Sequence, residues 1–240
     1  MGAKKDPVSR DIMYRARHSE IAQMVFERAL GDQEKRFEEY VRCLKSMNLT
    51  YEVDDKAFSE MVKAYSLMEL FSSYDMIDQI YDAAIEVGGD EAHVFHQRGI
   101  YQMRRSSPDF ELAEEFLQQA HSLRPYNSSI KHTLAELSLA MSKVAKTDVE
   151  REHRLIVAAD AAKSLCRGSR TSHPHTTLVK IGLARMRSAF NVQTTSERDF
   201  QTLIQDCEDS LSAGISAFPE SQPLLKLCLL YTSPSPRDRG

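Results

Sequence analysis

The chain of 240 residues lacks a basic surplus, a paired-cysteine pattern and any long apolar run. Its 31 lysines and arginines are outnumbered by 35 aspartates and glutamates, and this net charge of -4 argues against nucleic acid as a partner. The four cysteines include no CxxC pair and therefore fit a reducing compartment best. No stretch approaches the ~18 apolar residues that a membrane span needs, and no signal peptide pattern opens the chain. We therefore expect a cytoplasmic protein without a membrane span.

The motifs of the familiar enzyme classes are also missing. There is no GxxxxGK[ST] to cradle phosphates, no GxSxG nucleophile turn and no HExxH metal site. Paired carboxylates could perform acid/base work, but on helices they are better interpreted as solvated faces; they are Glu38 with Glu39 and Glu114 with Glu115. We predict that this segment is not an enzyme and holds no cofactor, with a helical-bundle enzyme as a distant alternative.

Two histidine pairs are the candidates for a metal site. His93 and His96 are three residues apart, with acidic residues just upstream, whereas His173 and His175 flank a proline in a loop. Zinc needs three or four converging ligands, and each pair offers two. Both pairs are therefore interpreted as ordinary polar residues, and no metal is predicted.

Helical periodicity is what the sequence does contain. From residue 11 to residue 218 apolar residues recur at spacings of three and four, while strand-like alternation is nearly absent. The predicted fold class is all-α. Breaks are expected at residues 31–32, 47–54, 88–89, 105–108, 125–127, 168–174 and 191–195. Three helix starts have candidate capping residues: Asp55, Ser107 and Ser196.

A register of small and large residues recurs along these helices. Ala113, Leu117, Ala120 and Pro125 follow one another at +4, +3 and +5, and the same spacing returns at Cys207, Leu211, Gly214 and Pro219, with a looser copy at Ile77, Tyr81, Ala84 and Gly89. Small residues let a second helix approach closely, and the large one fills the groove between the helices. Six positions are therefore predicted at close helix contacts: Gly99, Ala113, Ala120, Ala135, Gly182 and Gly214.

This register resembles the tetratricopeptide repeat, and residues 109–127, DFELAEEFLQQAHSLRPYN, are its most typical stretch. The resemblance covers residues 57–219 and implies an α-solenoid of antiparallel helix pairs. Steps between terminal turns exceed the ~34 residues of the standard repeat, and tryptophan is absent. We therefore expect divergent repeats with long helices, forming a domain over residues 55–227.

Residues 1–54 are expected to form a separate N-terminal helical segment. The stretch YRARHSEIA, residues 14–22, resembles the end of the winged-helix module of STAND-type signalling ATPases, where a basic, histidine-containing stretch faces nucleotide phosphates. The resemblance implies that Arg17 and His18 would contact the nucleotide of an ATPase domain encoded upstream. The alternative is a basic helix start with a surface histidine.

The last residues, 228–240, depart from the helical pattern of the preceding chain. CLLYTSPSPRD, residues 228–238, resembles the translation of a transposase sequencing adapter. We therefore expect a non-native tail that packs poorly and a native sequence that is truncated near Leu227. Pro234 and Pro236 cannot extend a helix, although Leu229 and Leu230 can prolong the last helix by a turn.

The predicted function is a non-catalytic scaffold that binds another protein, as the sensor or regulatory part of a larger signalling ATPase. The alternative is a freestanding tetratricopeptide-like adaptor. In this repeat family the first helix of each pair lines the concave face, so positions counted from Gly99, Ala135 and Gly182 are the candidates for recognition. The polar candidates are His96, Arg104, His132 and Arg187. Their basic character favours an acidic peptide as ligand.

Overall fold

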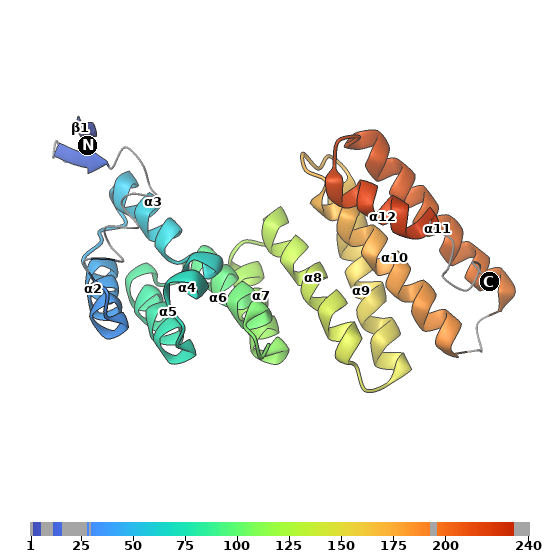
Figure 1. Cartoon of the computed structure of the whole chain (residues 1–240), viewed down its shortest axis with the longest axis horizontal. Coiled ribbons are helices and arrows are strands. Elements are labelled where there is room, and N and C mark those ends of the chain that lie inside the picture. The colour runs from blue at the N-terminus through green and yellow to red at the C-terminus, as the bar shows by residue number, and fades with distance from the viewer. Residues whose placement is uncertain (1, 6–11, 16–27, 29, 193–195, 233–240) are drawn as a thin grey trace. The chain divides into compact units, whose positions relative to one another are not determined.

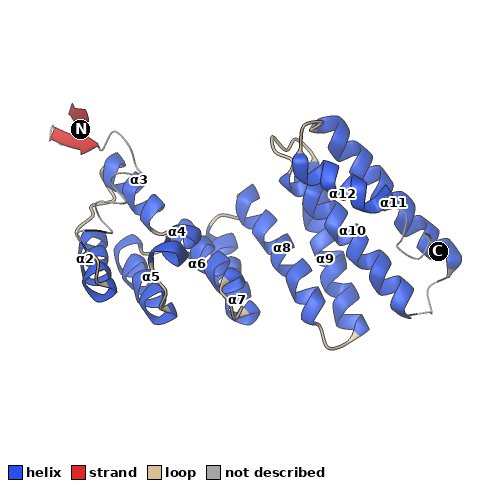
Figure 2. Ribbon diagram, viewed as in Figure 1, coloured by secondary structure: helices blue, strands red, loops and turns tan. Residues whose placement is uncertain are grey.

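The computed structural model of the chain describes residues 2–5, 12–15, 28, 30–192 and 196–232 (Figure 1). The described part is almost entirely helical (Figure 2), which confirms the all-α prediction. It contains eleven helices: α2 (Gln33–Lys45), α3 (Glu52–Met61), α4 (Ala64–Leu70), α5 (Tyr74–Gly88), α6 (Ala92–Arg104), α7 (Phe110–Leu123), α8 (Ser128–Val144), α9 (Asp148–Cys166), α10 (His173–Val192), α11 (Glu197–Ala217) and α12 (Gln222–Thr232). The chain divides into two compact units, Met1–Arg124 and Pro125–Gly240.

A short hairpin near the N-terminus departs from the helical prediction. Strand β1 (Gly2–Lys5) pairs antiparallel with β2 (Ile12–Arg15). β-branched and aromatic residues such as Ile12 and Tyr14 fit strands well. They lie in β2, although a helix was predicted from residue 11 onward. The expected helical segment over residues 1–54 therefore does not extend over these two strands.

The first unit is built around the contact between α6 and the helices on either side of it. α6 packs against α4, α5 and α7. Arg98 on α6 donates to the Asp82 carboxylate on α5 at 2.7 Å, and its guanidinium lies 4.5 Å from the ring centre of Phe116 on α7. The apolar core extends back to α2, where the Tyr40 hydroxyl donates to the Met61 carbonyl oxygen at 2.7 Å. One side chain on α6 thus links three helices by charge and stacking.

The second unit consists of α8 to α12, in which each helix packs against its neighbours in the chain. One apolar cluster joins α8, α9 and α10 through Leu139, Leu155 and Ile181. A second cluster joins α10, α11 and α12 through Val179 and Leu211 with the buried Leu224. α10 contributes to both clusters and is therefore the central helix of this unit.

Glycines mark the points where helices approach most closely. A Cβ atom added to Gly99 would lie 2.6 Å from Cγ of Leu117, and one added to Gly182 would lie 3.1 Å from Sγ of Cys207. At Gly214 the same atom would meet Cβ of His175 at 3.1 Å. The three alanines of the predicted set are fully or almost fully buried, namely Ala113, Ala120 and Ala135. The predicted close contacts are confirmed at the three glycines, and the three alanines are buried as such contacts require.

The helix starts follow the capping predictions only in part. Ser196 does cap α11, and its hydroxyl accepts from the Asp199 backbone N–H at 3.2 Å. Asp55 lies inside α3, which begins at Glu52 with Tyr51 as its N-cap, and α7 is capped by Asp109 rather than by Ser107. The cap of α3 thus lies four positions before Asp55, and its Tyr51 side chain makes no capping hydrogen bond, while the cap of α7 lies two positions after Ser107.

The last helix extends beyond Leu227, as predicted. α12 continues to Thr232, and the Leu229 side chain on it is 66% exposed. Cys228 packs against the cluster around Leu224. Pro234 and Pro236 lie outside the described residues.

Within the described part of the chain, no helix combines the length and the apolar character that crossing a membrane requires.

Candidate functional site

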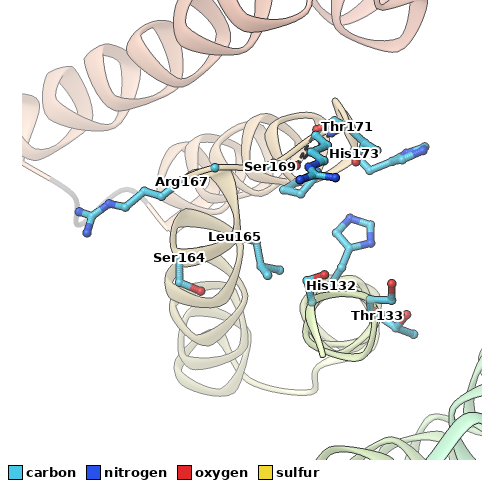
Figure 3. A pocket seen from close by; sticks show the side chains of 13 residues that line it. His132, Thr133, Ser164, Leu165, Arg167, Ser169, Thr171 and His173 are labelled. Carbon is cyan, nitrogen blue, oxygen red and sulfur yellow. Dashed lines mark hydrogen bonds between the residues drawn. The ribbon is translucent and has the colours of Figure 1, made fainter. Parts of the chain in front are cut away.

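A cleft of about 620 Å³ lies where α8 begins and α9 passes into α10. It is lined by 13 residues from the first turns of α8, the end of α9, the connecting loop and the first turn of α10 (Figure 3). We call it the α8–α10 cleft, and its lining is Ser128, Ser129, His132, Thr133, Ser164, Leu165, Arg167, Gly168, Ser169, Arg170, Thr171, His173 and Pro174.

The chemistry of this lining is one-sided. It combines two arginines, two histidines and six hydroxyl side chains, and none of the described residues that line it is acidic. Arginine offers a planar set of donors that matches a carboxylate in bidentate fashion, and serine and threonine hydroxyls both donate and accept. The cleft is therefore suited to a negatively charged, oxygen-rich ligand.

Local hydrogen bonds fix the α8 wall of the cleft. Asn127 caps α8, and its Oδ1 accepts from the backbone N–H groups of Ser129 at 2.9 Å and Ile130 at 3.2 Å. One turn later the Thr133 hydroxyl donates to the Ser129 carbonyl oxygen at 3.0 Å. The cap thus sets where α8 begins, and with it the positions of the two serines and His132.

The loop between α9 and α10 forms the opposite wall. Gly168 has φ of +77°, a left-handed conformation that glycine adopts without strain, and it turns the chain out of α9. Ser169 then closes a tight turn, because its hydroxyl donates to the Thr171 carbonyl oxygen at 2.8 Å and accepts from the Thr171 N–H at 3.2 Å. Arg167 and Arg170 lie on either side of this serine in the chain.

His132 reaches from α8 toward this loop, as Figure 3 shows. Its Nε2 shares a hydrogen bond of 3.1 Å with the Thr177 hydroxyl on α10, and its ring centre is 6.2 Å from that of His173. Burial lowers the pKa of His132, while the nearby Glu136 carboxylate acts in the opposite direction. The lowered pKa favours the neutral imidazole, which contributes hydrogen bonding rather than charge to the cleft.

The two arginines supply the charge. Both are exposed, and in Figure 3 the Arg167 side chain extends away from His132. Their exposure leaves the guanidinium groups able to swing over a segment bound in the cleft. Binding would order these long side chains, and that conformational cost opposes the electrostatic gain.

The residues predicted as a recognition surface are distributed over both units. His132 lies in the α8–α10 cleft. Arg187 is exposed on α10 but does not line the cleft, and Arg104 is exposed at the end of α6 in the first unit. His96, also on α6, is 8% exposed, and burial together with the neighbouring His93 lowers its pKa to about 4. Its buried, neutral ring makes His96 a packing residue of the first unit.

The predicted nucleotide contacts, Arg17 and His18, lie outside the described residues.

The histidines considered as metal ligands have other surroundings. The Nε2 of His93 lies 3.0 Å from the Ser59 carbonyl oxygen and shares a hydrogen bond with it. His175 is buried, with its ring 5.7 Å from that of Phe218. Within the described ranges, no group of three or more histidine, cysteine, aspartate or glutamate side chains could hold a metal ion.

Sequence reasoning missed most of the cleft. His173 was noticed as part of a loop pair without a partner, and the structure supplies that partner in His132, 41 positions earlier. Arg170 falls in the predicted break at residues 168–174 and Arg167 directly precedes it, and neither was singled out. The signal that could have identified them is the density of basic and hydroxyl residues in RGSRTSHPH, residues 167–175, which contains no acidic residue.

No protein-family model matches this chain, and neither a curated protein nor a solved structure matches it.

Proposed function

We propose that this chain is a non-catalytic helical scaffold that binds another protein by holding an acidic segment in the α8–α10 cleft. The observation that carries this proposal is a lining rich in arginine, histidine and hydroxyl groups in which no described residue is acidic. The cleft volume of about 620 Å³ can hold a few side chains of an extended peptide.

The division of roles within the cleft follows from the burial of its residues. Arg167 and Arg170 would pair with carboxylates of the partner, and their exposure makes this attraction sensitive to salt. The neutral His132, held by Thr177, would accept or donate a hydrogen bond at the floor. The serines at the start of α8 would contact the peptide backbone. The arginines would thus favour acidic peptides, and the hydroxyl groups would fix the position of the bound peptide.

The wider architecture is proposed as a tetratricopeptide-like α-solenoid of antiparallel helix pairs with divergent repeats. The close contacts at Gly99, Gly182 and Gly214 support it, because small residues at helix crossings are what that repeat requires. Within this class we favour the sensor or regulatory part of a cytoplasmic STAND-type ATPase, in which Arg17 and His18 would face the nucleotide. A freestanding adaptor is the second candidate. A P-loop encoded in frame upstream would support the ATPase, and a ribosome-binding site directly before Met1 would support the adaptor.

The binding proposal can be tested with a displayed library of random 12-residue peptides selected on the full chain. We expect enrichment of peptides with clustered aspartate and glutamate. Arg170→Ala should weaken the best of these peptides about 5- to 10-fold, since a hydrogen bond to a charged group contributes about 1.5–3 kcal/mol and solvent exposure lowers this contribution to about 1–1.4 kcal/mol. The matched control is Lys143→Ala, which removes an exposed cation on α8 away from the cleft lining. Enrichment without acidic residues, or equal losses in both variants, would overturn the proposal.

A further inference from the structure

A second concavity in the Pro125–Gly240 unit has the opposite character. It has a volume of about 800 Å³ and lies between α9 and α11, with α10 as its floor. We call it the α9–α11 groove, and its lining is Asp148, Val149, Glu152, His153, Ile156, Arg185, Ser188, Ala189, Asp199, Thr202, Leu203 and Asp206. It shares none of these residues with the α8–α10 cleft.

The apolar part of the groove comes from a helix that is apolar on two faces. α9 buries Leu155 and Ala158 in the core of the unit, yet it also presents Val149, 82% exposed, and Ile156, 43% exposed. The half-buried Leu203 on α11 faces the same groove. Fully covering a branched aliphatic side chain is worth about 1.5–3 kcal/mol, so a ligand that covered these residues would gain substantial affinity.

The edges of the groove are acidic. Four carboxylates line it, against one arginine and one histidine. Arg185 is already paired with Glu152, with 2.9 Å between Nε and Oε1. Asp148 pairs with Arg151, whereas Asp206 forms no ion pair with any residue that the structure describes. The α9 carboxylates are thus paired within the chain, and the α11 edge of the groove remains negatively charged.

We propose that the α9–α11 groove is a docking site for an amphipathic helix of a partner protein, one with an apolar ridge at i, i+3 and i+4 and with lysine or arginine on its flanks. Such a helix lays its apolar face into a groove between helices and fixes its register through the edges. Val149, Ile156 and Leu203 would receive the ridge, and Asp206 would receive a flanking cation. Charge complementarity favours this occupant over a second copy of the chain, whose own net charge is -4.

The test uses a displayed library of 18-residue peptides of high helix propensity, selected on the full 240-residue chain. We expect enriched sequences to place apolar residues three and four apart with lysine or arginine beside them. A fluorescein-labelled copy of the most enriched peptide then serves as the probe in anisotropy titrations. Ile156→Asp should weaken it at least 10-fold, and Asp206→Lys should weaken it about 3- to 5-fold and flatten its dependence on salt.

Matched controls separate docking from general effects. Val144→Asp changes an apolar side chain that is 62% exposed on α8 outside the groove, and Asp160→Lys reverses an exposed charge on α9 outside its lining. Both should leave the affinity unchanged. Where Ile156→Asp perturbs the circular dichroism spectrum, Val149→Asp replaces it, because that residue is nearly fully exposed.

Three outcomes would overturn the inference. They are the absence of basic amphipathic sequences from the enriched peptides, equal affinity of the groove variants and their controls, and concentration-dependent dimerisation in sedimentation velocity that Ile156→Asp abolishes. The last would identify a second copy as the occupant. Because this groove shares no lining residue with the α8–α10 cleft, its result is independent of the acidic-peptide proposal.

Discussion

Replacing Gly99 by alanine sets two effects of opposite sign against each other. Gly99 lies in the interior of α6, where alanine is favoured over glycine by about 1 kcal/mol through helix propensity. The added Cβ, however, would lie 2.6 Å from Cγ and 2.8 Å from Cδ2 of Leu117, and 3.3 Å from the Ala113 carbonyl oxygen. Cγ is the branch atom of a side chain that is 0% exposed, so the whole Leu117 side chain would have to move.

The steric crowding should outweigh the gain in helix propensity. Overpacking a filled core costs about 1–3 kcal/mol, and a clash with a branch atom belongs in the upper half of that range. We therefore expect Gly99→Ala to lose about 1–2 kcal/mol of unfolding free energy after the propensity gain is subtracted. The assay is urea denaturation followed by circular dichroism at 222 nm.

A double-mutant cycle identifies the cause. Leu117→Ala alone should cost about 2–5 kcal/mol, and its cost should fall by about 1–2 kcal/mol when Gly99→Ala is also present, because the new methyl group occupies part of the cavity. Gly31→Ala is the matched control, since a Cβ atom there meets nothing within 4 Å. A Gly99→Ala protein as stable as the wild type, with additive effects in the cycle, would refute the proposed close contact of α6 and α7.

Two further predictions concern buried titratable groups. Burial lowers the pKa of His96 to about 4, so neutral His96 stabilises the fold above pH 6.5 and this contribution is lost as the pH falls toward 4. Urea titrations should therefore show that His96→Gln loses less unfolding free energy over that range than the wild type, by ~2–3 kcal/mol. The control His153→Gln, at an exposed site, should follow the wild type. Burial also raises the pKa of the Cys207 thiol, which is 2% exposed. In the native protein a thiol reagent should therefore modify the exposed Cys43 rapidly, and Cys207 only as fast as the α10–α11 contact opens by local unfolding. Equal modification rates would contradict the packing of α10 on α11.

The helices and their contact points were readable from the sequence because both depend on local spacing. The pattern of small residues placed Gly99, Gly182 and Gly214 correctly at close helix contacts. Glycine destabilises a helix interior, so its presence there indicates that a neighbouring helix leaves no room for a side chain. Counting from Gly99 placed His96 on the concave recognition face, yet the structure buries it. Spacing fixes which face of a helix a residue occupies, but neighbouring helices decide which faces are covered.

Boundaries with weak local signals were missed. No break was predicted between α8 and α9, although α8 ends at Val144 and α9 begins at Asp148. Helix-forming residues continue across that stretch, and the turn contains neither glycine nor proline. Thr147 provides the stop and restart instead, because its side chain accepts from the Glu150 N–H and caps α9.

The candidate site was the least predictable feature. His132 was identified for a different reason, as a position on a presumed inner helix face, and Arg167 and Arg170 were not identified at all. These residues come together because the α9–α10 loop returns to the start of α8, a relation between segments more than 30 residues apart that periodicity does not encode. The composition of the loop gave a signal, but only the fold shows what it faces.

The most direct test of the acidic-peptide proposal is an NMR titration that follows the imidazole signals of the eight histidines as the selected acidic peptide is added. His132 and His173 line the α8–α10 cleft, whereas His153 lines the separate α9–α11 groove. We predict that the signals of His132 and His173 shift together along one saturation curve, with a single dissociation constant, while that of His153 stays in place. A shift of His153 without any change at His132 and His173 would contradict the proposal that this cleft is the binding site.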